Sequence, residues 1–133
     1  MSAMSDYLEN KLLDHVLGTT AFTMPVNVYV ALCTVATTDA DTGSTITEAG
    51  YTSYARIEVS DDWAAASSGS ADNAAIFEFP AATGGTATAT HFALCDAITD
   101  GNMLIHGALT SSLAISNGIT PAFVVGALVV TAD

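Results

Sequence analysis

The sequence predicts a mainly β protein, either an antiparallel β-sandwich or a flattened barrel of about seven or eight strands, with one amphipathic helix at its N-terminus. Apolar residues recur at helical spacing only before residue 18. From Pro25 the apolar period changes to two, and turn-forming residues separate short segments at hairpin spacing. A parallel α/β sheet would need helices between its strands, and no helical pattern follows. We expect the 133 residues to form one domain, with an arm over 1–5, a helix over 6–17 and a β domain over 25–133.

The predicted helix begins at a capping signal and ends at a glycine. Asp6 and Glu9 have the three-residue spacing of a capping box with Asp6 as the N-cap, and Gly18 can terminate the helix. Five apolar residues between these ends form one helical stripe: Leu8, Leu12, Leu13, Val16 and Leu17. A single short helix with such a stripe is expected to bury it against the sheet that follows.

Alternation of branched residues predicts the clearest strand, over 26–33, with one shared face made by Val26, Val28, Val30 and Leu32. Shorter patterns predict further strands over 54–59, 74–79, 88–95, 103–109, 113–115 and 123–131. The sequence Asp100-Gly101-Asn102 predicts a hairpin turn between two of them. Residues 37–50 are polar and hold no strong element, so we expect a long exposed loop there.

The charge of the chain excludes several classes of partner. Lys11 and Arg56 stand against fourteen Asp and Glu residues, and the formal net charge is −12. Such a protein repels phosphate backbones and anionic lipid headgroups, and it has few groups that can clamp a phosphate or carboxylate. We therefore expect no nucleic-acid partner, no membrane partner and no cofactor. Only 12% of the residues are charged, and the many small residues predict a large contact surface, with a Thr/Ser-rich monomer as the alternative.

The start of the chain is polar and lacks the apolar core of a signal peptide. No apolar run approaches the roughly 20 residues that span a bilayer. We therefore expect synthesis in the cytoplasm. Under that expectation Cys33 and Cys95 are free, buried thiols, with a disulfide between them as the alternative.

Few residues are candidates for chemistry. His91 and His106 flank the Asp100-Gly101 turn and could face each other across the hairpin, where Asp96 would complete a metal or acid–base site. We favour two strand histidines with satisfied hydrogen bonds, because no nucleophile motif and no complete ligand set accompany them. Residues 39–44 resemble the start of a calcium loop, but Ala49 occupies the position of its bidentate Glu. We predict a protein that is not an enzyme and has no metal site.

The residues expected to contact a partner lie in two regions. The first is the N-terminal arm: Met1, Ser2, Ala3, Met4 and Ser5. The second is the loop 37–50 with the residues after it, where Tyr51 and Tyr54 are candidate contacts or, alternatively, half-buried rim residues. Arg56 is expected to meet a carboxylate bidentately, within the fold or across a subunit boundary. Its candidate partners are Glu58, Asp61, Asp62 and Glu78.

Seven blocks of sequence, taken in order, carry a resemblance. They are residues 8–17, 28–32, 50–56 (GYTSYAR), 75–80 (AIFEFP), 90–97 (THFALCDA), 103–109 (MLIHGAL) and 128–130. Their order and spacing resemble a family of small tailed-bacteriophage virion proteins, often labelled tail fibre proteins and including capsid decoration proteins. The resemblance runs over nearly the whole chain and carries no catalytic motif with it.

This resemblance implies a structural virion protein, and the charge favours a position away from packaged DNA because both surfaces would be negative. The leading hypothesis is a capsid decoration or cement protein on the outer face of the head. There it would bind the major capsid protein or other virion proteins and stabilise subunit junctions by binding the assembled state. The alternative is a tail fibre or tail-tip domain that binds a host surface receptor. We expect a homo-oligomer, with a trimer as one candidate state.

Overall fold

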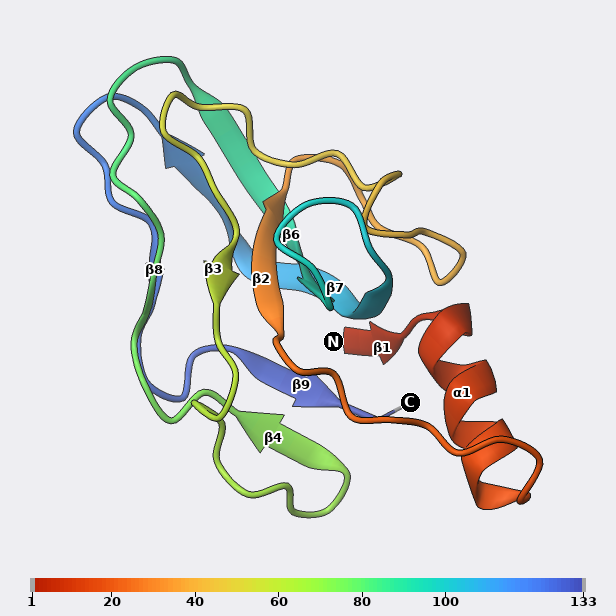
Figure 1. The fold of residues 1–133 in the computed structure, drawn as a ribbon. Helices are drawn as coiled ribbons and strands as arrows, with labels where there is room; N and C mark the ends of the chain where they lie inside the picture. Colours follow the sequence, from red (N-terminus) through yellow and green to blue (C-terminus); the bar gives the residue numbers. More distant parts are fainter. Residues whose placement is uncertain (1, 133) are drawn as a thin grey trace.

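The computed structural model describes residues 2–132, which form one helix and nine β-strands (Figure 1). Five strands make an antiparallel sheet in the order β1-β7-β6-β2-β3, and two smaller sheets pair β4 with β9 and β5 with β8. The elements are β1 (Ser2–Met4), α1 (Asp6–Val16), β2 (Tyr29–Cys33), β3 (Ile57–Glu58), β4 (Ser70–Asp72), β5 (Phe77–Glu78), β6 (Ala87–Cys95), β7 (Met103–Ile115), β8 (Ala122–Phe123) and β9 (Val129–Thr131). The mainly β prediction is confirmed in a sandwich-like form, and the described strands do not close into a barrel.

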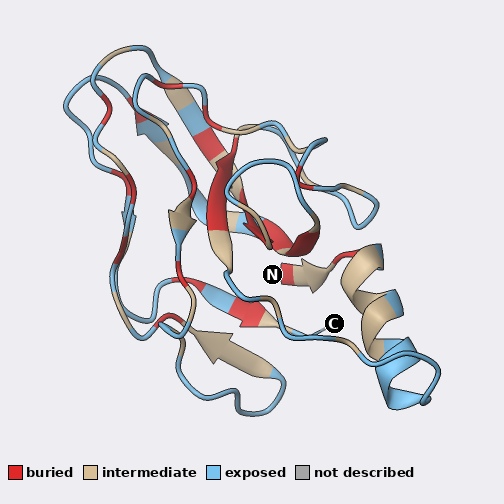
Figure 2. Ribbon diagram, in the orientation of Figure 1, coloured by how far each residue is buried: buried red, intermediate tan, exposed pale blue. Residues whose placement is uncertain are grey.

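Strand β2 separates two hydrophobic clusters, because successive side chains of a strand point to opposite faces. Val30 and Leu32 face the larger cluster, which also receives aromatic residues of 77–79 and apolar residues of 128–130. Ala31 and Cys33 face a smaller cluster on the other side of the sheet, against which Ile46 of the loop 37–50 packs. The predicted loop is therefore long and largely exposed, yet it covers one face of the sheet. Figure 2 shows the buried residues concentrated on β2, β6 and β7.

The hairpin of β6 and β7 is the centre of the main sheet, and its turn lies where the sequence predicts it. Asp100 and Gly101 both have positive φ angles, 52° and 75°, which is the conformation that an Asp-Gly turn supplies. Two irregularities interrupt the register of the hairpin, one between Ala89 and His91 and one between Leu94 and Cys95. Strand β7 runs without a break through residues 103–115, so the two separate strands predicted there form one element.

The helix forms where it was predicted, but its cap and its packing differ. Ser5, not Asp6, is the N-cap: the Leu8 N–H donates to Ser5 Oγ at 3.3 Å. No residue of α1 is buried, and the exposed fractions of Leu13 and Val16 are 58% and 76%. The expectation that the apolar stripe is buried against the sheet is wrong for this part of it. Strand β1 is the edge strand of the sheet, and α1, which follows it, contacts β7 and β1 without burying any residue of its own.

The remaining differences concern short strands. The predicted strands over 54–59 and 74–79 shrink to two residues each, β3 and β5. The predicted strand over 123–131 is split into β8 and β9 by a turn in which Gly126 has a φ of 77°. Val26, predicted on the buried face of the first strand, is 90% exposed, because β2 begins only at Tyr29. Strands β1 and β4 carry no periodic signal and were not predicted.

Candidate functional site

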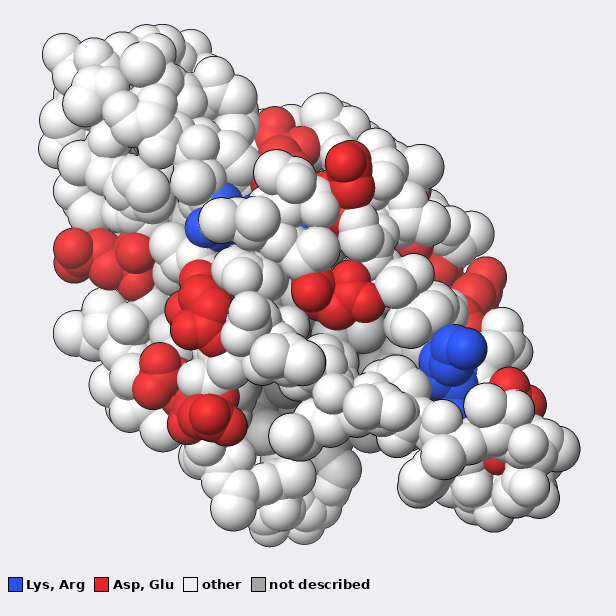
Figure 3. Space-filling model, in the orientation of Figure 1, with Lys and Arg blue, Asp and Glu red and all other residues white. Residues whose placement is uncertain are grey.

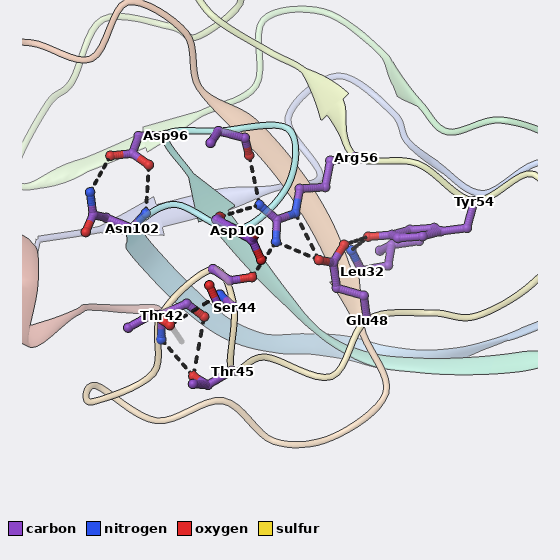
Figure 4. Close-up of polar contacts among 12 residues, drawn as sticks. Leu32, Thr42, Ser44, Thr45, Glu48, Tyr54, Arg56, Asp96, Asp100 and Asn102 are labelled. Carbon is purple, nitrogen blue, oxygen red and sulfur yellow. Dashed lines mark hydrogen bonds and ion pairs between the residues drawn. The ribbon is translucent and has the colours of Figure 1, made fainter.

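Arg56 lies at the centre of a buried polar cluster that ties three separate segments together (Figure 4). It is 4% exposed. Its Nε and Nη2 donate to Glu48 Oε1 at 3.0 and 2.6 Å, and its Nη2 also donates to the Gly43 carbonyl at 2.7 Å. Its Nη1 donates to the carbonyls of Ala97 and Asp100 at 2.8 and 2.9 Å. All five N–H donors of the guanidinium are therefore used within the chain.

The predicted ion pair of Arg56 exists within the fold, but its partner is Glu48 and none of the four predicted carboxylates. Glu48 belongs to the loop 37–50, and an isolated β-bridge places it opposite Cys33 at the end of β2. Glu58 was predicted because it lies two residues from Arg56 on the same strand face. It is instead exposed, and hydrogen bonds from the Ser60 side chain and the Ser60 N–H lower the pKa of its carboxyl. No local signal in the sequence marks Glu48, because its place opposite Cys33 depends on the course of the loop 37–50.

Tyr54 extends the cluster toward the larger hydrophobic core. Its hydroxyl donates to Glu48 Oε2 at 2.5 Å and accepts from the Leu32 N–H at 3.1 Å. Burial, reinforced by the hydrogen bond to Glu48, raises the pKa of Tyr54. Tyr51 is 3% exposed, and its hydroxyl donates to the Pro80 carbonyl. The two tyrosines meet edge to face with ring centroids 5.4 Å apart. Both side chains therefore pack within the chain.

The ion pair with Glu48 keeps Arg56 charged in its buried position. Burial alone lowers the pKa of Arg56, but the hydrogen bonds and charge of Glu48 outweigh it, and the pKa of Arg56 is raised. Among the described residues no buried side-chain nitrogen or oxygen lacks a hydrogen-bond partner. The cluster fixes the loop 37–50 and the turn 96–101 against β2.

The N-terminal segment is part of the main sheet. Ser2, Ala3 and Met4 form β1, which pairs antiparallel with residues 105–107 of β7. Ser2 Oγ accepts from the Thr131 N–H at 2.7 Å, so the segment also contacts β9. Ser5 is fully buried, and its hydroxyl donates to the Met103 carbonyl. Met1 lies outside the described residues. The described part of the predicted arm thus makes its contacts within its own chain.

The alternative in which the two histidines face each other does not form. The register places His91 opposite Ala108 and His106 opposite Ala93. His106 contacts Asp39 Oδ1 at 3.0 Å and Thr37 Oγ1 at 2.8 Å. The Asp96 carboxylate accepts two bonds from Asn102, which stabilise the hairpin turn. Within residues 2–132, no group of three or more His, Cys, Asp and Glu side chains could hold a metal ion.

The segment 39–44, which resembles the start of a calcium loop, is held by hydrogen bonds between residues of the same loop. Asp41 accepts from the Thr38 N–H at 2.8 Å and from the Thr45 hydroxyl at 2.8 Å. These bonds lower the pKa of Asp41. Cys33 and Cys95 are free and buried, as predicted. Burial raises the pKa of Cys33 to about 12 and that of Cys95 to about 11, so neither thiol is a ready nucleophile.

The described surface carries exposed apolar side chains. Large ones are exposed along α1 and the segment after it, which we call the 13–26 surface: Leu13, Val16, Leu17, Met24 and Val26, with exposed fractions from 58% to 90%. A cavity of about 440 Å³ lies beside this surface and is lined in part by Tyr7, Phe22 and Tyr29. Exposed apolar groups gathered in this way are typical of a contact with another macromolecule. The helix of residues 6–16 is too short and too polar to cross a membrane, and the described residues contain no other.

The described residues form a mainly β protein whose buried polar cluster is satisfied within the chain and whose surface exposes large apolar side chains. The chain belongs to a family of tailed-phage virion proteins of fibre type: the family model described as podophage GP4 fiber I protein gp80 matches residues 3–131. A search of curated proteins found no match. The resemblance inferred from the sequence blocks is thereby confirmed, and the family implies that this chain is located in the virion.

Proposed function

We propose that this chain is a repeated structural subunit of a virion fibre, and that it acts by packing against other virion proteins and not by catalysis. The 13–26 surface carries the proposal. Five large apolar side chains, more than half exposed, lie within fourteen residues of the chain. Their burial against a neighbour would contribute about 25 cal/mol for each square ångström removed from water. The family name supports a fibre as the place where this happens.

The location can be tested on purified particles with gold-labelled antibodies against this chain. The proposal expects gold along fibres and a copy number well below that of the head protein. A label spread over the whole head would refute the fibre assignment. In parallel, Val16→Asp should lower the number of copies per particle, and Thr19→Asp, which adds the same charge at an exposed position outside the apolar set, should not. Equal occupancy of the two variants would remove the 13–26 surface from the mechanism.

A capsid decoration or cement role on the outer face of the head is the second candidate. The charge favours it: a surface with a net charge of −12 is repelled by packaged DNA and suits the exterior of the shell. Under this proposal the chain binds the major capsid protein and stabilises the assembled shell by mass action. Particles stripped of the chain should release DNA at a lower temperature than intact ones. Release at an unchanged temperature would leave this role without support.

Self-association is part of both proposals. The described N-terminal residues pair with β7, and the 13–26 surface offers exposed apolar side chains for contacts between copies. Light scattering of the purified chain at several concentrations would give the oligomeric state. A mass equal to one chain at all concentrations would contradict self-association in the absence of partners.

A further inference from the structure

The middle of β7 has no strand partner on either side among the described residues. Ala89 of β6 is opposite Leu113 and His91 is opposite Ala108, so residues 109–112 face Thr90 alone. On the other edge, β1 pairs only with residues 105–107. The extra residues of β7 therefore form a bulge, and bulges leave local backbone N–H and C=O groups without their sheet partners. We call residues 109–112 the β7 bulge.

The bulge is one wall of a cavity of about 510 Å³ that opens beside it. Its other lining residues include four members of the larger core cluster and one residue packed against it: Leu32, Phe79, Phe92 and Leu128, with Phe123. Protein interiors are normally filled to the density of organic crystals, and a void of this size is well above the volume of several side-chain methyl groups. An apolar side chain supplied from outside would fill it.

The same region is free of charge in an otherwise acidic molecule. Residues 79–95 and 101–132 contain no Asp, Glu, Lys or Arg. These segments include β6, β7, β8 and β9. In Figure 3 the end of the molecule where β6 begins and β7 ends shows neither acidic nor basic atoms. A strand edge without charged residues lacks the usual protection against pairing with another chain, so an uncharged segment can approach it without repulsion or desolvation of an ion.

We propose that the β7 bulge and its cavity bind an extended, uncharged segment of another virion polypeptide. The segment adds a strand along residues 109–112 and places one apolar side chain in the cavity. This mode combines main-chain hydrogen bonds, which give affinity, with a side-chain pocket, which gives specificity. The exposed Thr110, Ser111 and Ser112 leave room for such a strand. The inference rests on the proposed presence of the chain in the virion.

A second copy of this chain fits the site less well. Two β7 strands paired about a two-fold axis at Ser111 would bring the small Ser111 side chains together at the cavity and leave it unfilled. A separate segment with a bulky residue at the matching position avoids this problem.

The test uses particles that carry a photo-cross-linking residue, Ser112→p-benzoylphenylalanine, with Ala65→p-benzoylphenylalanine as the matched control at an exposed position outside the bulge. Irradiation of purified particles should join residue 112 to one other virion polypeptide, within a run of at least five residues that lacks Asp, Glu, Lys and Arg. An adduct with a second copy of this chain, an adduct with a charged segment, or no adduct above the level of the control would overturn the proposal.

A second variant pair measures the contribution of the site to assembly. Thr110→Lys adds a charge to the bulge edge, and Ala65→Lys adds the same charge elsewhere. We expect at least a tenfold loss of copies per particle for the first and no loss for the second, with equal melting temperatures of the purified chains. Equal occupancy would refute the inference. Absence of the unmodified chain from particles would instead refute the proposed function itself, so the two failures are distinguishable.

Discussion

Removal of the Arg56 side chain tests whether the buried polar cluster stabilises the fold. The variant Arg56→Met keeps most of the aliphatic stem and deletes all five donors. Three backbone carbonyls and the Glu48 carboxylate then lose a donor. Breaking a buried ion pair by removing one partner costs about 3–5 kcal/mol. Because the Glu48 side chain is 24% exposed and can regain some water, we expect the lower end of that range, about 3 kcal/mol.

The other cation of the chain provides the matched control. The Lys11 Nζ lies 5.7 Å from the centroid of the Tyr7 ring on the surface of α1. Lys11→Met makes the same change of charge as Arg56→Met but removes only an exposed contact, which is worth about 0.5–1 kcal/mol. The comparison therefore separates the buried network from the general effect of a more negative chain.

Urea unfolding followed by Trp63 fluorescence measures both free energies of unfolding. For a domain whose total stability is about 5–15 kcal/mol, a loss of about 3 kcal/mol is a large shift of the midpoint. Amide hydrogen exchange should also accelerate in residues 42–48 and 96–101, which the guanidinium joins, before it changes in β6. Surface substitutions normally change the free energy of unfolding by no more than about 0.5 kcal/mol. A difference of less than about 1 kcal/mol between Arg56→Met and Lys11→Met would therefore refute the assignment of Arg56 as the buried link.

Three further predictions follow from the same geometry. Burial raises the pKa of Cys33 to about 12 and that of Cys95 to about 11, so folding favours the protonated thiols. The free energy of unfolding should be constant below about pH 9. Above that pH it should fall by about 1.4 kcal/mol per thiol per pH unit until the pKa of the folded state is reached. Urea titrations from pH 8 to 11 check this, and a flat profile contradicts it. Gly43→Ala places a Cβ 1.9 Å from a backbone carbonyl oxygen of the β6–β7 turn, whereas Gly50→Ala meets no atom within 4 Å; the first should lose at least about 2 kcal/mol and the second under about 0.5, and equal melting temperatures would disprove the close approach. Ser5→Ala removes the helix cap and should cost about 1–2 kcal/mol with a loss of helical circular dichroism at 222 nm, a result that an unchanged spectrum and midpoint would contradict.

The elements that the sequence predicts well are those with a local cause. The alternation over 26–33, the hairpin at Asp100-Gly101 and the helix over 6–17 each depend on residues close together in the chain. Their observed boundaries differ from the predicted ones where a long-range contact sets the end of the element. Ser5 is the N-cap because β7 holds its backbone, through the hydrogen bond from the Ser5 N–H to the Leu104 carbonyl. Strand β1 is three residues long, too short for any period to show.

The candidate site shows the same division. Sequence reasoning identified Arg56 as a residue that must find a carboxylate, because a lone guanidinium in an apolar chain has few other partners. It could not identify Glu48, because that choice depends on how the loop 37–50 crosses the end of β2. The sequence left two interpretations open for Tyr51 and Tyr54, as partner contacts or as half-buried rim residues. In the structure both side chains pack within the chain, Tyr54 against Phe79 and both against the larger core. The N-terminal arm was expected to contact a partner. Its pairing with the edge of β7 could not be predicted, because nothing in the sequence of residues 1–5 indicates that this edge is open.

The burial of Arg56 changes what the charge of the chain means for assembly. With that guanidinium used internally, Lys11 is the only Lys or Arg side chain on the surface of the described residues, against thirteen Asp and Glu of which most are exposed or half-exposed. Contacts with neighbours can then hardly be built from complementary ion pairs on this chain. They form more readily where exposed apolar or uncharged groups gather, as on the 13–26 surface, whose only Asp or Glu is Asp14, and in the region of the β7 bulge. An assembly joined in this way is held by apolar burial and main-chain hydrogen bonds. The acidic residues on the rest of the surface repel other copies and stay exposed to water.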